Sequence, residues 1–176
     1  MSTRKKSFVL SLLLFSVLWA IPAMGTTCLN YGGKAYIAPL HYYTSTNGAR
    51  RNNIYLSNVS SGTVSVTVKL YNDSGAPLTQ IETIDGTFYQ GAAINISHNV
   101  AAGTVTFNLA TKTTAVLQLK PNAAGTYVNV GYGEVVWAAE NVEGPALLGR
   151  VRTFFEDPNS NLDPMGTFVL NGGQPF

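Results

Sequence analysis

Four oxygen-bearing side chains occur at alternate positions of one polar stretch, a spacing that suits a loop around a hard cation. They are Asp157, Asn159, Asn161 and Asp163. Calcium takes about six to eight oxygen ligands, and alternate loop residues can turn their oxygens toward one centre. The same residue types are equally typical of a polar turn between two strands. We therefore predict no resident cofactor, with calcium at these four residues as the one candidate exception.

Two adjacent tyrosines at the end of a predicted strand form the second candidate site. Successive strand residues point to opposite faces, so either Tyr42 or Tyr43 must point away from the core. Exposed tyrosine and tryptophan rings can stack on a sugar, because each has an apolar face and a polar tip. We predict a ligand-binding aromatic patch of Tyr42, Tyr43 and Trp137. The alternative is that these rings stabilise the sheet through cross-strand pairs.

One carboxylate, Glu134, lies within an otherwise apolar predicted strand. Glycoside hydrolysis needs two carboxylates across a cleft, and the sequence places no second acid opposite Glu134. Strand alternation turns Glu134 outward, where the basic stripe of Arg150 and Arg152 is expected to pair with it. The chain contains neither a Gly-x-Ser-x-Gly elbow nor a His-Glu-x-x-His motif. We therefore predict no enzymatic activity and no catalytic residue.

Charge is scarce in this chain and its positive excess lies at the amino terminus. The 176 residues include 11 Lys or Arg and 9 Asp or Glu, so that 11% are charged, against about 25% in typical soluble domains. Arg4, Lys5 and Lys6 precede an apolar run that ends in small residues at Gly25, a pattern typical of a secretory signal. We predict a cleavable signal peptide over residues 1–25 and a single domain over residues 26–176. That domain has 8 basic and 9 acidic side chains, which excludes an electrostatic nucleic-acid partner.

The predicted signal implies export, and it leaves open the secreted, periplasmic and cell-surface compartments. The chain then meets a membrane only through the signal peptide, before cleavage. The single cysteine, Cys28, excludes an intramolecular disulfide. Three alternatives stay open for Cys28: a free thiol, a thiol paired with another chain, or a lipid-modified residue. About 150 residues can bury a sizeable core without disulfides.

Alternation of apolar and polar residues with period two dominates the predicted domain. Residues 64–71 alternate Val and Leu with Ser, Thr and Lys, which is typical of a strand with one buried face. The other predicted strands cover residues 35–40, 53–58, 78–84, 93–97, 104–109, 114–119, 127–137, 147–155 and 167–170. Many short strands with no helices between them predict an all-β fold, an antiparallel sandwich of about 8–10 short strands.

Residues 53–75 show a family likeness. They contain a strand, a corner at Asn58-Val59-Ser60, a second strand, and a turn that ends at Gly75. This run resembles the first hairpin of immunoglobulin-like β-sandwich modules of bacterial secreted proteins, and residues 111–121 resemble their later Leu-x-Pro segment. The resemblance implies an immunoglobulin-like sandwich with an adhesive, structural or carbohydrate-associated role. It implies no catalytic residue.

The leading functional hypothesis is an exported, non-enzymatic structural or interaction module of the cell surface, periplasm or matrix. Such a module would bind other protein chains, or itself, by pairing edge strands, with residues 26–34 reaching a neighbouring chain. The first alternative is a carbohydrate-binding module that holds a glycan on exposed aromatic rings. The second alternative is a small outer-membrane β-barrel, which the chain length fits.

Overall fold

The computed structural model describes residues 30–45, 48–78, 81–82, 93–99, 101–121, 127–140, 142–159 and 161–176. The strands are β1 (Asn30–Ser45), β2 (Gly48–Asn58), β3 (Val64–Tyr71), β4 (Ile81–Glu82), β5 (Ala93–Asn99), β6 (Thr104–Leu109), β7 (Thr114–Pro121), β8 (Tyr127–Glu140), β9 (Leu147–Glu156) and β10 (Leu162–Val169), and the 3-10 helix η1 is Leu170–Gly173. Within this part of the chain no helix is long and apolar enough to cross a membrane. The predicted signal peptide over residues 1–25 and Cys28 lie outside the described residues.

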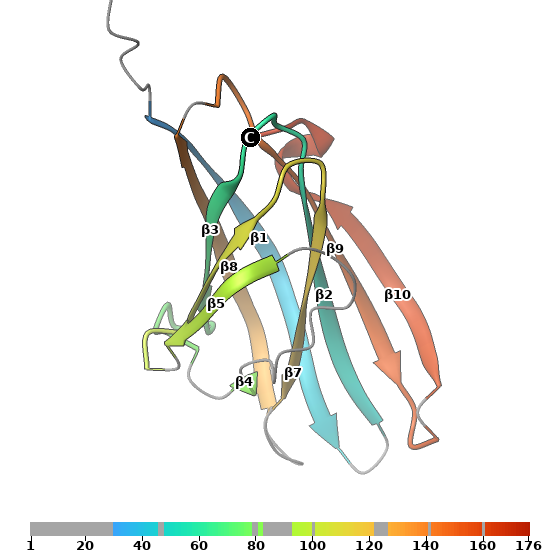
Figure 1. Cartoon of the computed structure of the whole chain (residues 1–176). Helices are drawn as coiled ribbons and strands as arrows, with labels where there is room; N and C mark the ends of the chain where they lie inside the picture. The colour runs from blue at the N-terminus through green and yellow to red at the C-terminus, as the bar shows by residue number, and fades with distance from the viewer. Residues whose placement is uncertain are drawn as a thin grey trace, which may run out of the picture.

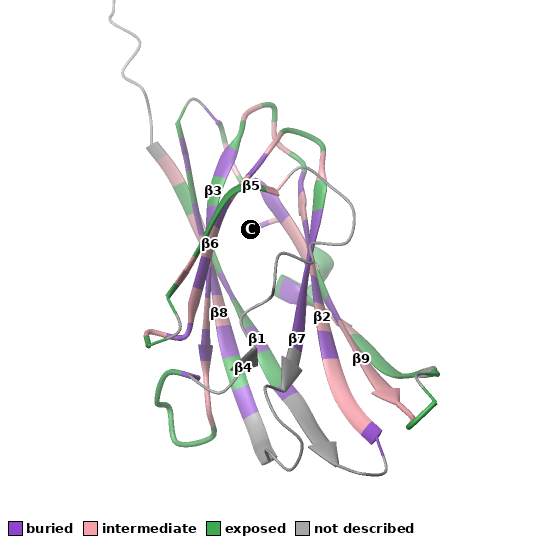
Figure 2. Cartoon of the chain, turned by 60° about the horizontal axis from the view of Figure 1, so that its bottom comes forward, coloured by how far each residue is buried: buried purple, intermediate pink, exposed green. Residues whose placement is uncertain are grey.

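The strands form two antiparallel layers (Figure 1). The first layer has the order β1-β8-β3-β6-β5, and the second has β10-β9-β2-β7, with β4 beside β7. A hairpin joins the layers, because the end of β1 pairs with the start of β2, where Tyr43 lies opposite Arg50. Figure 2 shows the layers facing each other, with buried residues on the strands of both. The predicted all-β antiparallel sandwich is confirmed.

Alternation sorts the side chains of each strand into core and surface. On β2, Ile54 and Leu56 are buried while Tyr55 between them is only partly buried. The largest fully buried side chains come from both layers: Phe107, Ile37, Leu40, Ile54, Leu56, Leu109, Leu117, Leu119, Leu147, Leu170 and Val64. Burying an apolar side chain of this size contributes about 1.5–3 kcal/mol, so these facing rows hold the two layers together.

The segment after β10 turns back over one end of the core. Leu170 of η1 is buried and lies so close to Gly149 that a Cβ there would come within 2.5 Å of Leu170 Cδ1. Asn171 and Gly172 then adopt positive φ angles, which reverse the chain. Phe176 returns to the core cluster and is buried, and Figure 2 marks this terminus between the layers.

The start of β1 differs from the sequence-based expectation. The sequence predicts that residues 26–34 reach a neighbouring chain, but residues 30–34, the described part of this segment, pair with β8 of their own layer, where Lys34 lies opposite Val136. The physical reason is Gly33, whose missing Cβ leaves room for the Trp137 ring directly beside the backbone. Glycine in a strand permits this close approach. The first strand therefore completes its own sheet and runs for 16 residues.

Candidate interaction surfaces

An ion-pair ladder crosses the outer face of the first layer. The Glu134 carboxylate on β8 lies 3.0 Å from Lys34 Nζ of β1 and 3.4 Å from Lys69 Nζ of β3. Because β8 runs between β1 and β3, its outward carboxylate has a basic side chain on either side. The prediction that Glu134 faces outward and pairs across strands is confirmed. The predicted partners were wrong, because Arg150 and Arg152 lie on β9 in the other layer.

These contacts fix the charge state of the ladder. The hydrogen bond from Lys34 holds the pKa of Glu134 below its usual range, partial burial acts in the opposite direction, and the bond from Lys69 adds to the lowering. The pKa of Lys34 is raised to about 12, first by its side-chain hydrogen bond with Tyr36 and then by that with Glu134. A carboxylate between two ammonium groups stays ionised at neutral pH. The ladder thus explains why a charged residue occurs in an otherwise apolar strand.

Three tyrosines surround the ladder, and we call them the tyrosine face: Tyr36, Tyr71 and Tyr132. The rings of Tyr71 and Tyr132 are stacked, with centroids 4.7 Å apart and planes at 18°. Tyr36 is 61% exposed and Tyr132 is 38% exposed. These tyrosines are not among the predicted ligand-binding residues. Tyr132 shares the outward face of β8 with Glu134, so strand alternation could have identified it.

One of the three residues of the predicted aromatic patch, Trp137, lies in the core. Trp137 on β8 is only 3% exposed and belongs to the core between the layers, so its ring offers no surface for an external ligand. Alternation explains this, because Trp137 shares its face of β8 with the buried Val135. Tyr42 and Tyr43 lie near the end of β1, and their side chains lie outside the described residues. A patch at these two tyrosines stays a prediction.

Three of the four candidate calcium residues, Asp157, Asn159 and Asn161, lie in the turn between β9 and β10. Asp157 Oδ1 accepts hydrogen bonds from the backbone N–H groups of Asn159 and Asn161, at 2.9 and 2.8 Å, and Oδ2 accepts one from Asn161 Nδ2 at 2.9 Å. These bonds, led by that from the Asn161 side chain, lower the pKa of Asp157. Asp163 instead belongs to β10, opposite Phe155. Among the described residues, no group of three or more His, Cys, Asp or Glu side chains lies together. Calcium binding here stays a prediction.

Each layer has an end strand that exposes apolar side chains. β5 lies at one end of the first layer and β10 at one end of the second. The other ends are β1, whose last residues pair with β2, and β7, whose last residues pair with β4. Ile94 and Ile96 on β5 are 51% and 36% exposed, and Met165 and Val169 on β10 are 50% and 53% exposed. Exposed apolar side chains beside unpaired backbone groups are features of a strand that can accept another strand.

The edge strands β5 and β10 differ in the features that hinder pairing with a further strand. β10 carries Asp163 and Pro164, and its register with β9 shifts between Pro164 and Gly166. β5 contains neither proline nor a Lys, Arg, Asp or Glu residue. Its one irregularity is a bulge at Asn95, which has a φ of 57° where the register with β6 shifts. Proline, charge and bulges all make an edge less able to pair, so β5 is the more open edge.

The strand order of the described residues defines an all-β antiparallel sandwich in which β5 and β10 are exposed end strands. No protein-family model matches the chain, and no curated protein matches it. Among solved structures the chain is similar to the collagen-binding domain from a Staphylococcus aureus adhesin, with 9% identity over 74% of this chain and 95% of that chain, and a TM-score of 0.25. A likeness this slight carries no argument about the fold or function of this chain.

Proposed function

We propose that the protein is an exported, non-enzymatic interaction module that associates with a second copy of itself through β5. The observation that supports this is that β5 is an open edge strand with exposed apolar side chains. The strand ends the first layer, pairs with β6 alone among the described strands, and exposes Ile94 and Ile96. An open edge offers backbone N–H and C=O groups to an incoming strand, and the exposed side chains add apolar contact.

A second copy of the chain is the partner that suits this edge best. Two β5 strands that run antiparallel about a twofold axis present the same surface to each other, as symmetric dimers do. The isoleucines of one copy would then lie close to those of the other, where cross-strand apolar pairs stabilise a sheet. The bulge at Asn95 keeps each regular paired run short, which favours a finite dimer over an open-ended fibre.

Export and a place outside the cell belong to the same proposal. Their support is the pattern of basic, apolar and small residues over 1–25. The absence of enzymatic activity is supported by Glu134, whose carboxylate is occupied by Lys34 and Lys69. A module of this kind would hold surface or matrix material together rather than transform a substrate.

Sedimentation velocity of the purified protein over a wide concentration range tests the proposal. The informative variants are Ile94→Lys and Ile96→Lys, which place a charge on the open edge. Val59→Lys is the matched control, since Val59 is 43% exposed but lies outside the strands. We expect the wild type and Val59→Lys to form dimers and both β5 variants to stay monomeric. A wild type that is monomeric throughout, or β5 variants that dimerise like the wild type, would overturn the proposal.

A second candidate function is the binding of a neutral glycan, and the tyrosine face favours it. Tyr36 and Tyr132 are exposed on one face of the first layer, where a sugar ring could stack on either ring. Glycan-array screening of the wild type, Tyr36→Ala, Tyr42→Ala and Tyr43→Ala tests this. Loss of binding in Tyr36→Ala supports the tyrosine face, and loss only in the other two variants supports the predicted patch instead.

A further inference from the structure

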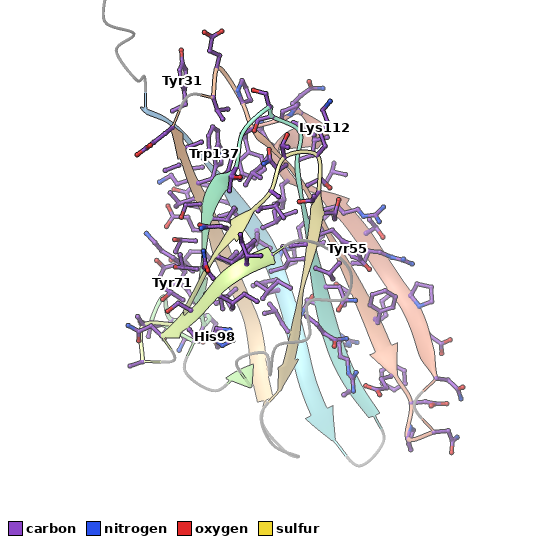
Figure 3. All side chains as sticks on the ribbon, viewed as in Figure 1. Tyr31, Tyr55, Tyr71, His98, Lys112 and Trp137 are labelled. Carbon is purple, nitrogen blue, oxygen red and sulfur yellow. The ribbon has the colours of Figure 1, made fainter. Side chains whose placement is uncertain are left out.

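A groove of about 360 Å³ lies on the outer face of the second layer. Its lining includes Tyr55 and Ser57 of β2, Thr114 of β7, Leu148 and Arg150 of β9, and Val169 of β10. Figure 3 places Tyr55 on the opposite side of the molecule from Tyr71 of the tyrosine face. Small-molecule sites typically enclose about 300–1,000 Å³, so this groove has room for a short ligand.

The segment that follows β10 helps to shape the groove. Gly173 of η1 is part of its lining. η1 is held in place by Leu170, whose buried side chain occupies the space that a Cβ on Gly149 would need. The lining comes from four paired strands, β7, β2, β9 and β10, and a turn anchored in the core, so the groove is largely preformed.

Two arginines give this face a positive charge, and no acid among the described residues forms an ion pair with either of them. The Arg150 guanidinium lies 4.5 Å from the centroid of the Tyr55 ring, and that of Arg152 lies 4.8 Å from the Phe154 ring. The ion pairs of the described residues join Lys34 and Lys69 to Glu134 and Arg51 to Glu156, and none includes Arg150 or Arg152. An aromatic ring holds a guanidinium in place and leaves its N–H donors available to an anion.

Hydroxyl and apolar groups complete the lining. Ser57 Oγ and Thr114 Oγ1 lie 2.7 Å apart and share one hydrogen bond, so the second hydroxyl proton can be donated to a ligand. Leu148 and Val169 add apolar surface, and Val169 is 53% exposed. Together the groove offers a planar cation, hydroxyl groups and a short apolar wall.

We propose that this groove binds an acidic saccharide, in which a sugar ring carries a carboxylate. Arg150 would donate paired hydrogen bonds to the carboxylate, the geometry in which guanidinium and carboxylate interact most strongly. The hydroxyls of Ser57 and Thr114 would bond ring hydroxyls of the sugar, and Val169 would contact its C–H face. This site lies in the second layer, so it is independent of the β5 edge.

The backbone around the groove favours a saccharide over an acidic peptide. Extended peptides are commonly bound by adding a strand to an open sheet edge, through main-chain hydrogen bonds. At the groove, β2 is paired with β7 on one side and β9 on the other, and Tyr55 lies opposite both Val116 and Arg150. A ligand therefore meets side chains there, which suits a sugar rich in hydroxyl groups.

Isothermal titration of the purified protein with a short oligogalacturonate tests the proposal. The comparison ligands are a neutral galactose oligomer of the same length and a glutamate oligopeptide. We expect saturable oligogalacturonate binding that weakens with salt. The neutral galactose oligomer should bind about tenfold or more weakly, because it lacks the carboxylate that Arg150 would bond. The glutamate oligopeptide should also bind more weakly, because it has no ring hydroxyls for Ser57 and Thr114.

Substitutions locate the site. Arg150→Gln should weaken oligogalacturonate binding by about tenfold or more, and Arg150→Lys should weaken it less, since it keeps the charge but loses the planar fork. Lys69→Gln removes one positive charge from the opposite layer and should bind as the wild type does. Matching thermal unfolding curves would show that the variants fold.

Three results would overturn the proposal. They are an absence of saturable oligogalacturonate binding, equal affinity for the glutamate oligopeptide, and unchanged binding by a folded Arg150→Gln protein. The second result would assign the groove to acidic peptides. Because the groove and β5 lie in different layers, the titration and the dimerisation experiment can fail separately.

Discussion

The backbones of Phe176 and Leu147 are paired by two hydrogen bonds. The N–H of Phe176 donates to the Leu147 carbonyl at 2.9 Å, and the N–H of Leu147 donates to the Phe176 carbonyl at 3.0 Å. The pairing directs the Phe176 side chain into the core cluster, where the residue is 8% exposed. The residues after η1 thus cover the end of the sandwich and help to place η1 beside the groove.

Phe176→Ala should lower the free energy of unfolding by about 3–5 kcal/mol, the usual cost of truncating a buried phenylalanine. The expected loss reflects both the lost apolar burial and the cavity between the layers. Denaturant unfolding measures it, with Gln174→Ala as the control at an exposed position of the same segment. A loss as small as the roughly 0.5 kcal/mol typical of surface substitutions would show that Phe176 does not seal the core.

Asn58 holds the corner between β2 and β3, and it is buried. Its Nδ2 lies 2.7 Å from the Gly62 carbonyl oxygen and 3.0 Å from that of Leu109, while its Oδ1 accepts a hydrogen bond from the backbone N–H of Ser60 at 2.9 Å. Asn58→Ala removes the hydrogen bonds that the amide donates to the Leu109 and Gly62 carbonyls, although the Gly62 carbonyl also accepts one from Ser60 Oγ. We therefore expect a loss of about 1–3 kcal/mol in the free energy of unfolding.

Asn72→Ala is the control for the Asn58 prediction. The Asn72 side chain also accepts backbone hydrogen bonds, from Ser74 and Ala76, but in an exposed turn. We expect a smaller loss of about 0.5–1.5 kcal/mol, the net worth of ordinary hydrogen bonds. Equal losses in the two variants would contradict a special role for the buried corner.

The ion-pair ladder predicts how stability depends on pH. The folded-state pKa of Glu134 is lowered from its usual value of 4.5. The stabilisation is therefore fully present above that usual value, and it is lost as the pH falls through the lowered pKa. Glu134→Gln should reduce stability at neutral pH by about 1 kcal/mol or less for each of its two partly exposed ion pairs.

Denaturant unfolding from neutral pH into the acid range tests this pH dependence. It gives the free energy of unfolding of the wild type and of Glu134→Gln. The difference between the two proteins should shrink as the pH falls below the usual value of 4.5. Some acid sensitivity should persist in the variant, because the pKa of Asp157 is also lowered. A difference that is independent of pH would show that the carboxylate charge of Glu134 does not stabilise the fold.

Gly33→Ala should destabilise the protein by about 1–3 kcal/mol, as overpacking of a close contact does. The new methyl group would collide with the Trp137 ring and with the backbone of Phe176. Thermal unfolding and tryptophan fluorescence report the change. Gly166→Ala is the control, since a Cβ there meets nothing within 4 Å. If the two variants unfold alike, the close packing of Gly33 on Trp137 is not required.

The all-β fold could be predicted from the sequence, because the alternation of apolar and polar residues along a strand depends only on neighbouring residues. The alternating run at residues 64–71 became β3, and Glu134 faces outward as its strand position required. The partners of Glu134 could not be predicted in this way, since they depend on β8 lying between β1 and β3. That order is set by packing between segments far apart in the chain.

The candidate sites were harder to predict for the same reason. The aromatic ring of Trp137 suggests a ligand-binding residue, yet strand alternation and the close approach of Gly33 place Trp137 in the core. Arg150 was selected as a partner for Glu134, but it lies over Tyr55 in the other layer. A residue type indicates what a side chain can do, whereas the layer and the face decide what it meets.

We propose that two copies of the protein associate through the β5 edge. Amide hydrogen exchange of residues 93–99, compared between dilute and concentrated protein, tests it most directly. The backbone N–H groups of β5 that do not face β6 should exchange more slowly when dimers form, while those of β10 are unchanged. Unaltered exchange across β5 in a protein that dimerises, or new protection at β10 instead, would contradict the claim.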